Sequence, residues 1–335
     1  MIEGGLGVAK VAVDAFGGDY APEAIVEGAL LAAHEDGIEV ILTGDEEKLK
    51  ALIDGKPGSE RIEIVHAPEI IQMDEAPVEA VRSKKDSSLS VAAGLVRDGR
   101  AGACVSAGNT GATLAASLFV IRRIKGVERP AITSLMPTRT GVSLLVDAGA
   151  NVDCRPSQLV QFAKMGAIYS ERVLKVNRPR VGLLNIGHEP GKGNSLVQET
   201  YKLLQDSALN FIGNIEGRDV SRGDADVIVC DGFVGNVVLK FAEGLADALF
   251  GMLKEELTKN AVRKAGALLL ASGFKTIKKR VDYTEYGGAP LLGVNGVVII
   301  AHGGSNAKAI YNAIRVAKEG INHGLVDIIA GAMVE

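Results

Sequence analysis

Short apolar runs alternate along the chain with helix-like segments, and this alternation predicts the secondary structure. The first run, Val11–Val13, is typical of a buried strand. The helix predicted after it has Pro22 in its first turn and Gly37 just past its end, where these residues commonly begin and end helices. Further strands are predicted at 38–43, 62–66, 103–106, 181–186, 211–215, 227–230 and 297–301, and further helices at 45–53, 88–97, 109–124, 158–174, 195–204, 234–257 and 306–318. Because strands separated by helices pair in parallel, we predict an α/β fold with a doubly wound, mostly parallel sheet.

The middle of the chain follows a different pattern. Ala131–Met136 and Val142–Asp147 are apolar runs separated only by residues 137–141. So short a connection suits an antiparallel hairpin better than a parallel crossover. No Pro- or Ser-rich linker divides the chain, so we expect a single domain over residues 1–335, in one lobe or two.

The composition argues against several classes of protein. The formal net charge of −4 gives no sign of general nucleic-acid binding. Cys104, Cys154 and Cys230 are far apart in the sequence, so neither a disulfide framework nor a zinc site is expected, and a reducing cytosol fits. The N-terminal residues lack the pattern of a signal peptide, and no apolar stretch approaches the roughly 20 residues that cross a bilayer. We therefore expect a cytoplasmic protein with no metal or other cofactor.

Five predicted strands end in loops of glycine and small residues. These loops are Asp14–Asp19, Ser106–Gly111, Asn185–Asn194, Asp231–Asn236 and His302–Asn306. The carboxyl ends of parallel strands share one edge of a sheet, so the five loops should meet there and bind a phosphate or an oxyanion. In the fourth loop the strand joins the next helix without a spacer, which should leave the first N–H groups of that helix free for an anion. Each loop taken singly is equally explained by the glycine that a tight turn needs.

Several side chains in these loops are candidates for chemistry. Lys192 is flanked by glycines and could approach an anion closely, although a solvated surface lysine is the alternative. Asn236 and Asn109 could join the backbone donors around an oxyanion, or cap the helices that follow. His302 could bind phosphate, act as acid or base, or be structural. Cys230 is better explained by apolar packing than as a nucleophile, since no histidine is close to it in the sequence.

Residues 254–280 combine an apolar centre with basic flanks and are predicted to form a protruding amphipathic helical hairpin. Such a hairpin could dip its apolar side chains into a membrane interface while the flanking cations meet anionic headgroups. A helix pair that covers a core or a dimer seam, or a dock for an acidic protein, explains the pattern as well. The residues that would contact a membrane or a partner are Arg263, Lys264, Leu268, Leu269, Leu270, Phe274, Lys278 and Lys279.

The five loops, together with the motif Tyr286–Gly293 (YGGAPLLG), resemble the acyl-acyl carrier protein:phosphate acyltransferase (PlsX) family of phospholipid synthesis over about residues 11–326. The resemblance implies a fold like that of isocitrate and isopropylmalate dehydrogenases and of phosphotransacetylase, and a homodimer. It also implies transfer of a fatty acyl group from acyl carrier protein to inorganic phosphate. The acyl phosphate would then serve a membrane glycerol-3-phosphate acyltransferase, and the protein would associate peripherally with the membrane.

This chemistry needs no protein nucleophile, because phosphate itself attacks the thioester. The protein must align the two reactants and stabilise the tetrahedral oxyanion. We expect Lys192, Asn236 and His302 to be the catalytic side chains. Phosphate or substrate binding is assigned to Asp14, Gly17, Gly18, Ser106, Gly108, Asn109, Thr110, Gly111, Asp231, Gly232 and Gly235. The alternatives are a coenzyme A-dependent phosphotransacylase, a metal-dependent hydroxyacid dehydrogenase and a non-catalytic membrane scaffold.

Overall fold

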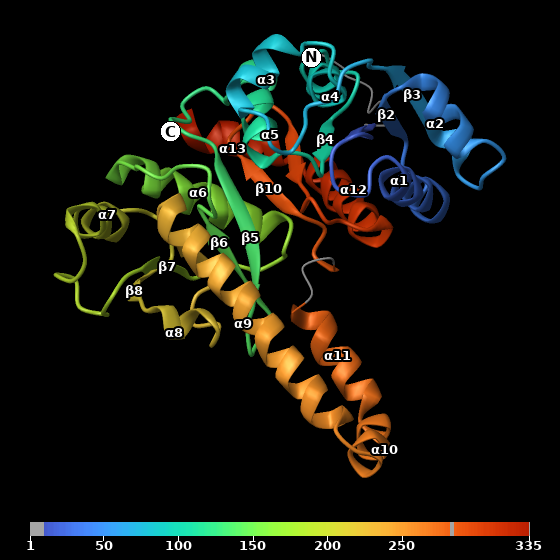
Figure 1. The fold of residues 1–335 in the computed structure, drawn as a ribbon. Coiled ribbons are helices and arrows are strands. Elements are labelled where there is room, and N and C mark those ends of the chain that lie inside the picture. The colour runs from blue at the N-terminus through green and yellow to red at the C-terminus, as the bar shows by residue number, and fades with distance from the viewer. Residues whose placement is uncertain (1–9, 282–284, 335) are drawn as a thin grey trace.

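A computed structural model describes residues 10–281 and 285–334, without the side chains of 278–281. Its centre is an eleven-stranded sheet with the order β3-β2-β1-β4-β11-β10-β5-β6-β9-β7-β8 (Figure 1). The strands are β1 (Val11–Asp14), β2 (Val40–Gly44), β3 (Ile62–His66), β4 (Ala103–Ser106), β5 (Ala131–Pro137), β6 (Val142–Val146), β7 (Val181–Leu184), β8 (Phe211–Ile215), β9 (Val227–Val229), β10 (Ala289–Leu292) and β11 (Val297–Ile300). The predicted α/β class with a mostly parallel sheet is confirmed.

The sheet reverses direction at its centre. Strand β10 pairs antiparallel with both β11 and β5, and β5 pairs antiparallel with β6, as the predicted hairpin required. All other neighbouring pairs are parallel. Consequently β1, β4 and β11 run one way, whereas β6, β9, β7 and β8 run the other way. The sheet has two parallel halves of opposite direction, joined through β10 and β5.

Helices cover both faces of this sheet. They are α1 (Glu23–Asp36), α2 (Glu46–Ile53), α3 (Pro77–Ser83), α4 (Ser88–Arg97), α5 (Thr110–Ala116), α6 (Pro156–Arg172), α7 (Ser195–Gln205), α8 (Gly217–Val220), α9 (Gly232–Thr258), α10 (Ala261–Leu269), α11 (Ala271–Val281), α12 (Ala307–Asn322) and α13 (Leu325–Val334), with a short 3₁₀ turn at Ser59–Arg61. On one face, α3, α4, α5 and the start of α9 pack in a single apolar core that extends across both halves. On the other face, α1 and α12 cover the first half and α6, α7 and α13 cover the second.

Some elements differ from the prediction. The helix predicted at 109–124 is α5 followed by a π-helical turn (Ser117–Ile121), and it ends where Arg122 adopts a left-handed φ of 72°. Helices α3, α8 and α13 and strand β10 were not predicted. Strand β10 is short and begins with Ala289-Pro290 between glycine-rich turns, so neither its length nor its composition indicated a central strand.

The long helix α9 leaves the body of the molecule, and the chain returns along α10 and α11 to form a protrusion (Figure 1). The hairpin predicted at 254–280 is therefore the end of α9 together with the two shorter helices. Within the described part of the chain, no helix is both long and apolar enough to span a membrane.

Candidate functional site

A cavity of about 350 Å³ lies on the face of the sheet that α5 and α9 share. Thr110 and His302 line it from the first half of the molecule, and Gly149 and Asn236 line it from the second. Its other lining residues are Ile132, Ser134, Leu135, Ala148, Leu239, Lys240, Glu243, Tyr286, Gly288, Ala289, Ile300 and Ala301. The cavity thus combines hydroxyl, amide and imidazole groups with an apolar floor from the central strands, a composition typical of small-molecule sites.

This position corrects the expectation that all five loops meet at one sheet edge. Because β7 and β9 run opposite to β1, β4 and β11, the loops that follow them leave from the other edge. Asn236 and His302 nevertheless line the same cavity, because it lies over the reversed central strands rather than beyond one edge. The single-edge rule applies to parallel sheets, and β10 and β5 interrupt this one.

The three loops of the first half do converge. Asp14 is buried at the end of β1 and accepts a hydrogen bond of 2.8 Å from the Ser106 hydroxyl, which in turn accepts one of 3.1 Å from the Gly108 amide. A Cβ on Gly17 would lie 2.5 Å from the Asp14 carboxylate and 2.8 Å from the Gly108 nitrogen, so only glycine fits there. Burial raises the pKa of Asp14, and the hydrogen bonds it accepts oppose that rise. These residues lie behind the cavity. None of them is among its lining residues in the described part of the chain.

The third loop of this group is joined to the first. The Asp19 amide donates to the Gly303 carbonyl over 2.9 Å, and Gly18, at φ 114°, lies against the same carbonyl. His302 is exposed and its Nδ1 accepts from the Gly304 amide over 3.1 Å. The imidazole is therefore oriented by its own loop.

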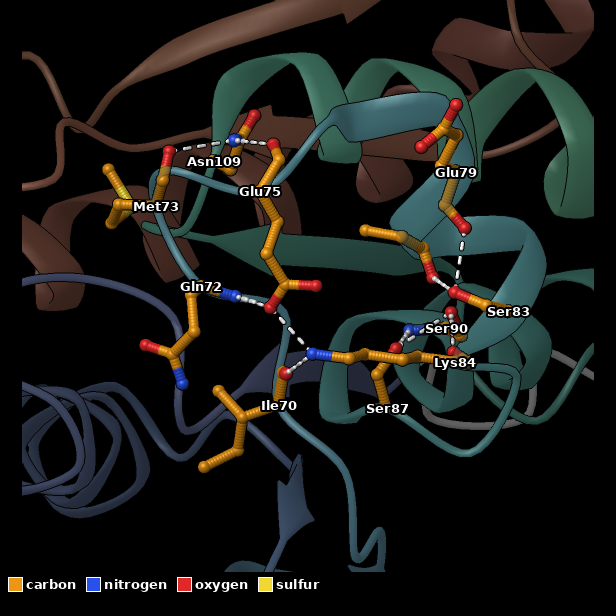
Figure 2. A network of polar contacts seen from close by, with 11 residues as sticks. Ile70, Gln72, Met73, Glu75, Glu79, Ser83, Lys84, Ser87, Ser90 and Asn109 are labelled. Carbon is orange, nitrogen blue, oxygen red and sulfur yellow. Dashed lines mark hydrogen bonds and ion pairs between the residues drawn. The ribbon is translucent and has the colours of Figure 1, made fainter.

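Asn109 caps α5, since its side-chain oxygen accepts from the Ala112 amide over 3.0 Å. Its amide nitrogen donates to the carbonyls of Met73, at 2.9 Å, and Glu75, at 3.3 Å (Figure 2). Lys84 holds the same loop by donating to the Ile70 carbonyl at 2.8 Å and to the Glu75 carboxylate at 2.5 Å. The capping alternative is thus realised, and this side chain secures the 70–75 segment instead of facing the cavity. Gly111 follows in α5, where a Cβ would lie 2.7 Å from Pro77.

In the second half, a fully buried carboxylate organises the loop after β6. Asp147 accepts five hydrogen bonds of 2.7 to 3.1 Å from the amides of Ile132, Gly149, Ala150 and Asn151 and from the Asn151 side chain. Burial raises its pKa, against the effect of these bonds. This loop brings Gly149 within 3.6 Å of Asn236, measured from the position a Cβ would take.

The start of α9 is more fully bonded than the sequence suggested. The Gly232 amide donates to the Asn151 carbonyl over 2.7 Å, and the Val234 amide donates to the capping carboxylate of Asp231 over 2.9 Å. The Gly235 amide donates to the Asp231 carbonyl over 2.9 Å, and its Cα faces the Asp147 carbonyl so closely that no side chain would fit. These three amides therefore do not form the open anion cradle that we expected. Asn236, the next residue, is exposed to the cavity.

Lys192 lies in the loop after β7. It is not one of the described residues that line the cavity. Its amide donates to the Glu189 carbonyl at 3.0 Å, and its carbonyl accepts from Asn185 at 3.1 Å. The exposed side chain runs past Gly187. The structure therefore brings together two of the three expected catalytic side chains, His302 and Asn236, and leaves the lysine apart.

The cysteines and the acidic residues fit structural roles. Burial raises the pKa of the Cys230 thiol well above its usual value, and that of half-buried Cys154 to about 12. A thiolate nucleophile is disfavoured at both. Within residues 10–281 and 285–334, no cluster of metal-binding side chains is present.

The sequence did not indicate Ser134, Lys240 or Glu243 as site residues, although all three line the cavity. Ser134 lies on a strand of ordinary composition, and the other two are charged residues on a long amphipathic helix. Tyr286 and Gly288 could have been found, because they belong to the YGGAPLLG motif that carried the family resemblance.

The hairpin residues divide into two groups. Leu268, Leu269 and Leu270 are exposed where α10 meets α11, with exposed fractions of 77, 86 and 60%. Arg263 and Lys264 are also exposed, whereas Phe274 is half-buried in a cavity of about 350 Å³ between α9 and α11. The side chains of Lys278 and Lys279 lie outside the described residues.

Solved structures share this architecture. A phosphotransacetylase from Streptococcus pyogenes aligns with a TM-score of 0.64 at 21% identity, over 94% of each chain. A 4-hydroxythreonine-4-phosphate dehydrogenase from Klebsiella pneumoniae aligns with a TM-score of 0.54 at 13% identity, over 92% of this chain and 98% of that one. At such identities the likeness establishes the class of fold alone, an α/β fold with a mostly parallel sheet.

The sequence comparisons are more specific. The profile of the family described as "Fatty acid synthesis protein" matches residues 9–327. The phosphate acyltransferase of Pelotomaculum thermopropionicum is 54% identical over 324 residues, covering 97% of this chain and 95% of the relative. The phosphate acyltransferase of Desulfitobacterium hafniense (strain DSM 10664 / DCB-2) is 56% identical over 321 residues, covering 96% of each. The chain belongs to this family and is an acyltransferase of lipid biosynthesis, as the resemblance implied.

Proposed function

We propose that the chain transfers a fatty acyl group from acyl carrier protein to inorganic phosphate and releases acyl phosphate for phospholipid synthesis. The observation that carries this proposal is the cavity between α5 and α9, where polar groups from both halves face an apolar floor. Membership of a family whose curated relatives are phosphate acyltransferases supports the same reaction.

In this reaction a phosphate oxygen attacks the thioester carbonyl and forms a C–O bond, and the C–S bond then breaks. The carrier thiolate leaves and takes up the proton that hydrogen phosphate gives up, so the reaction involves no oxidation or reduction. Asn236, Thr110 and His302 supply donors for the phosphate and the tetrahedral oxyanion, and Ile132, Leu135 and Ile300 give the first methylenes of the acyl chain an apolar surface.

Lys192 is our candidate for neutralising the phosphate charge, although this role requires its loop to reach the substrate in the working enzyme. We expect Lys192→Ala to lower kcat by at least about tenfold, with Lys202→Ala, an exposed lysine on α7, as the matched control. Unchanged acyl phosphate formation by Lys192→Ala would show that the lysine takes no part in the mechanism. The cavity residues would then have to bind the phosphate without it.

The decisive assay follows the release of carrier thiol from acyl-acyl carrier protein with and without phosphate, and traps acyl phosphate with hydroxylamine. We expect thiol release to need phosphate and to match the trapped product one for one. A second arm offers acyl coenzyme A, because the fold neighbours include phosphotransacetylases. Exclusive use of coenzyme A would assign a phosphotransacylase, and no phosphate-dependent release from either donor would favour the non-catalytic scaffold.

We also propose that the chain forms a homodimer. Helix α9 exposes apolar side chains at helical spacing along its length, namely Phe233, Val237, Phe241, Leu245, Leu249 and Met252. A stripe of this length on a water-soluble surface is typical of an interface. Light scattering should give a molecular mass of twice the chain mass. Phe241→Glu should lower the measured mass towards that of a single chain. A wild-type mass of one chain would reject the dimer.

Peripheral membrane contact through the hairpin is a third element of the proposal, supported by Leu268, Leu269 and Leu270 beside exposed cations. It would deliver acyl phosphate to a membrane glycerol-3-phosphate acyltransferase. In a flotation experiment the wild-type protein should float with anionic vesicles, whereas the Leu268→Glu and Leu269→Glu variants should stay behind. Equal flotation of the variants and the wild type would reject this contact.

The finer resemblance of the fold to isocitrate and isopropylmalate dehydrogenases is also a proposal.

A further inference from the structure

A second and larger hollow, of about 680 Å³, lies on the same face of the sheet but on the far side of α5. It runs over the outer surface of α4 and is bordered by α3 and by the π-helical turn after α5. We call it the α4 groove. None of its lining residues lines the catalytic cavity.

The floor of the α4 groove is apolar and open. Gly94 stands in the interior of α4, and the nearest atom to a Cβ built on it is an Arg97 nitrogen at 4.0 Å, so the glycine leaves space that a side chain would fill. A glycine in the interior of a helix is less favourable than an alanine. Val91 and Leu95 flank it, and Phe119 is 44% exposed at the border.

The border of the groove is positively charged. Arg82, Lys85, Arg97 and Arg100 line it, and Asp98 is the one carboxylate among the lining residues that the structure describes. Asp98 is paired with Arg97, and Arg100 is paired with Glu63. The Arg82 guanidinium lies over the Phe119 ring, 5.1 Å from its centroid. Lys85 has no ion-pair partner among the described residues, in a chain whose net charge is −4.

We propose that the α4 groove is the docking surface for the carrier protein, through an acidic helix whose apolar side chains cover Phe119 and Gly94. This inference rests on the proposed function, because it supplies the partner of that reaction. The cations at the border match an acidic surface, and an apolar centre within a charged rim is the usual anatomy of such interfaces.

The groove lies within reach of the catalytic cavity. Val120 lines the groove and Thr110 lines the cavity, and these two residues are ten positions apart along α5 and the π-helical turn, which corresponds to about 15 Å at helical rise. A thioester on an extended, flexible prosthetic arm can cover such a distance while the carrier itself stays outside.

A chain of polar contacts joins the two sites (Figure 2). Ser90, in the groove, donates to the Lys84 carbonyl over 3.0 Å, and Lys84 binds Glu75. The Glu75 carbonyl accepts from Asn109, next to Thr110 of the cavity. These contacts tie the 70–75 segment to the start of α4 and to the start of α5, so the groove and the cavity are joined by hydrogen-bonded structure.

The hairpin is a weaker candidate for an acidic partner. Its cations Lys259 and Arg263 are already paired with Glu256, and its tip presents three exposed leucines. The larger volume of the α4 groove, its open floor at Gly94 and its short distance along α5 from the catalytic cavity favour the groove.

The test measures binding of fluorescently labelled holo-acyl carrier protein, without an acyl group, by anisotropy. Lys85→Glu and Arg82→Glu should each weaken binding by at least about tenfold, and added salt should weaken wild-type binding in the same direction. Lys202→Glu, the same charge change on α7, should bind as the wild type does. Equal affinity of the wild type and both groove variants would overturn the proposal.

Gly94→Leu provides a variant without any change of charge. It fills the groove floor and favours the helix, so the protein should fold, as far-ultraviolet circular dichroism checks. We expect KM for acyl-acyl carrier protein to rise while kcat stays within about twofold, the pattern of a lost binding contact. An unchanged KM in a folded Gly94→Leu protein would count against the groove.

These readouts separate the two proposals. Carrier binding that depends on Lys85, without phosphate-dependent thiol release, would reject the proposed function. It would still support the α4 groove as the docking surface. Phosphate-dependent release with a KM that the groove variants leave unchanged would keep the function and reject the dock.

Discussion

Asp14 and Asp147 occupy similar places in the two halves of the molecule, but their carboxylates are bonded very differently. Each is buried where a strand ends, and burial raises the pKa of both. Asp147 accepts five hydrogen bonds from its own loop and from Ile132, whereas Asp14 accepts one from the Ser106 hydroxyl and one of 3.3 Å from the Phe16 amide, with Gly17 packed against its carboxylate. The difference teaches that Asp147 fixes the conformation of one loop through many amide donors, while Asp14 joins the first and second glycine loops of its half through fewer bonds.

The largest effect should come from Asp147→Ala. It leaves buried amide donors without an acceptor, and we expect the free energy of unfolding to fall by at least about 3 kcal/mol. Urea denaturation followed by circular dichroism measures the loss, with Asp153→Ala, an exposed aspartate nearby, as the control. A loss as small as that of the control would mean that the two aspartates do not differ in the way we infer.

Gly235→Ala should be the next most damaging change. The new methyl group would collide with the Asp147 carbonyl, which is backbone and cannot turn away. We expect a loss of about 2 kcal/mol or more from overpacking. Gly244→Ala lies on the same helix with no atom within 4 Å of its Cβ, and it should stabilise the protein slightly. Similar behaviour of the two variants would contradict the close approach of α9 to the Asp147 loop.

Ser106→Ala tests the role of Asp14 through the dependence of protein stability on pH. A raised carboxyl pKa in the folded state gives stability that is fully present below the unfolded value of 3.8 and is lost as pH rises through the folded value. The Ser106 hydrogen bond lowers that pKa, so its removal should cost about 1 kcal/mol at pH 7 and less at pH 5. Ser143→Ala, whose buried hydroxyl bonds a carbonyl, should show a deficit that does not change with pH. A pH-independent deficit for Ser106→Ala would show that Asp14 does not ionise within this range.

The smallest effect is expected at Cys230. Its thiol is buried with a strongly raised pKa, and it donates to the Asp147 carbonyl, so Cys230→Ala should retain kcat within about twofold. A thiol reagent at pH 8 should modify half-buried Cys154 before Cys230. A large loss of kcat without a loss of stability would show that Cys230 takes part in the reaction.

The sequence predicted the helices and outer strands well because each has its own apolar pattern and end signals. It predicted the β5–β6 hairpin for the same reason, since five intervening residues exclude a crossover helix. It could not place β10, whose position depends on partners far away in the chain, and the five loops were therefore assigned to one edge. Asn236 and His302, which line the cavity, could be named as candidates from local signals, whereas Ser134 and Glu243 line it only because of tertiary packing.

The insertion of β10 between β11 and β5 has a consequence for how the protein is made. The Thr133 hydroxyl bonds the Pro290 carbonyl across 157 residues of sequence, and β11 in turn pairs with β4. A ribosome that has released the chain as far as α9 has produced both halves of the sheet with bare edges at β4 and β5. Such edges invite pairing with other chains, and long-range strand pairing is slow. The C-terminal β10–β11 pair closes this gap, so the cavity that β10 and β11 help to line and the protection from aggregation are completed in the same late step of folding.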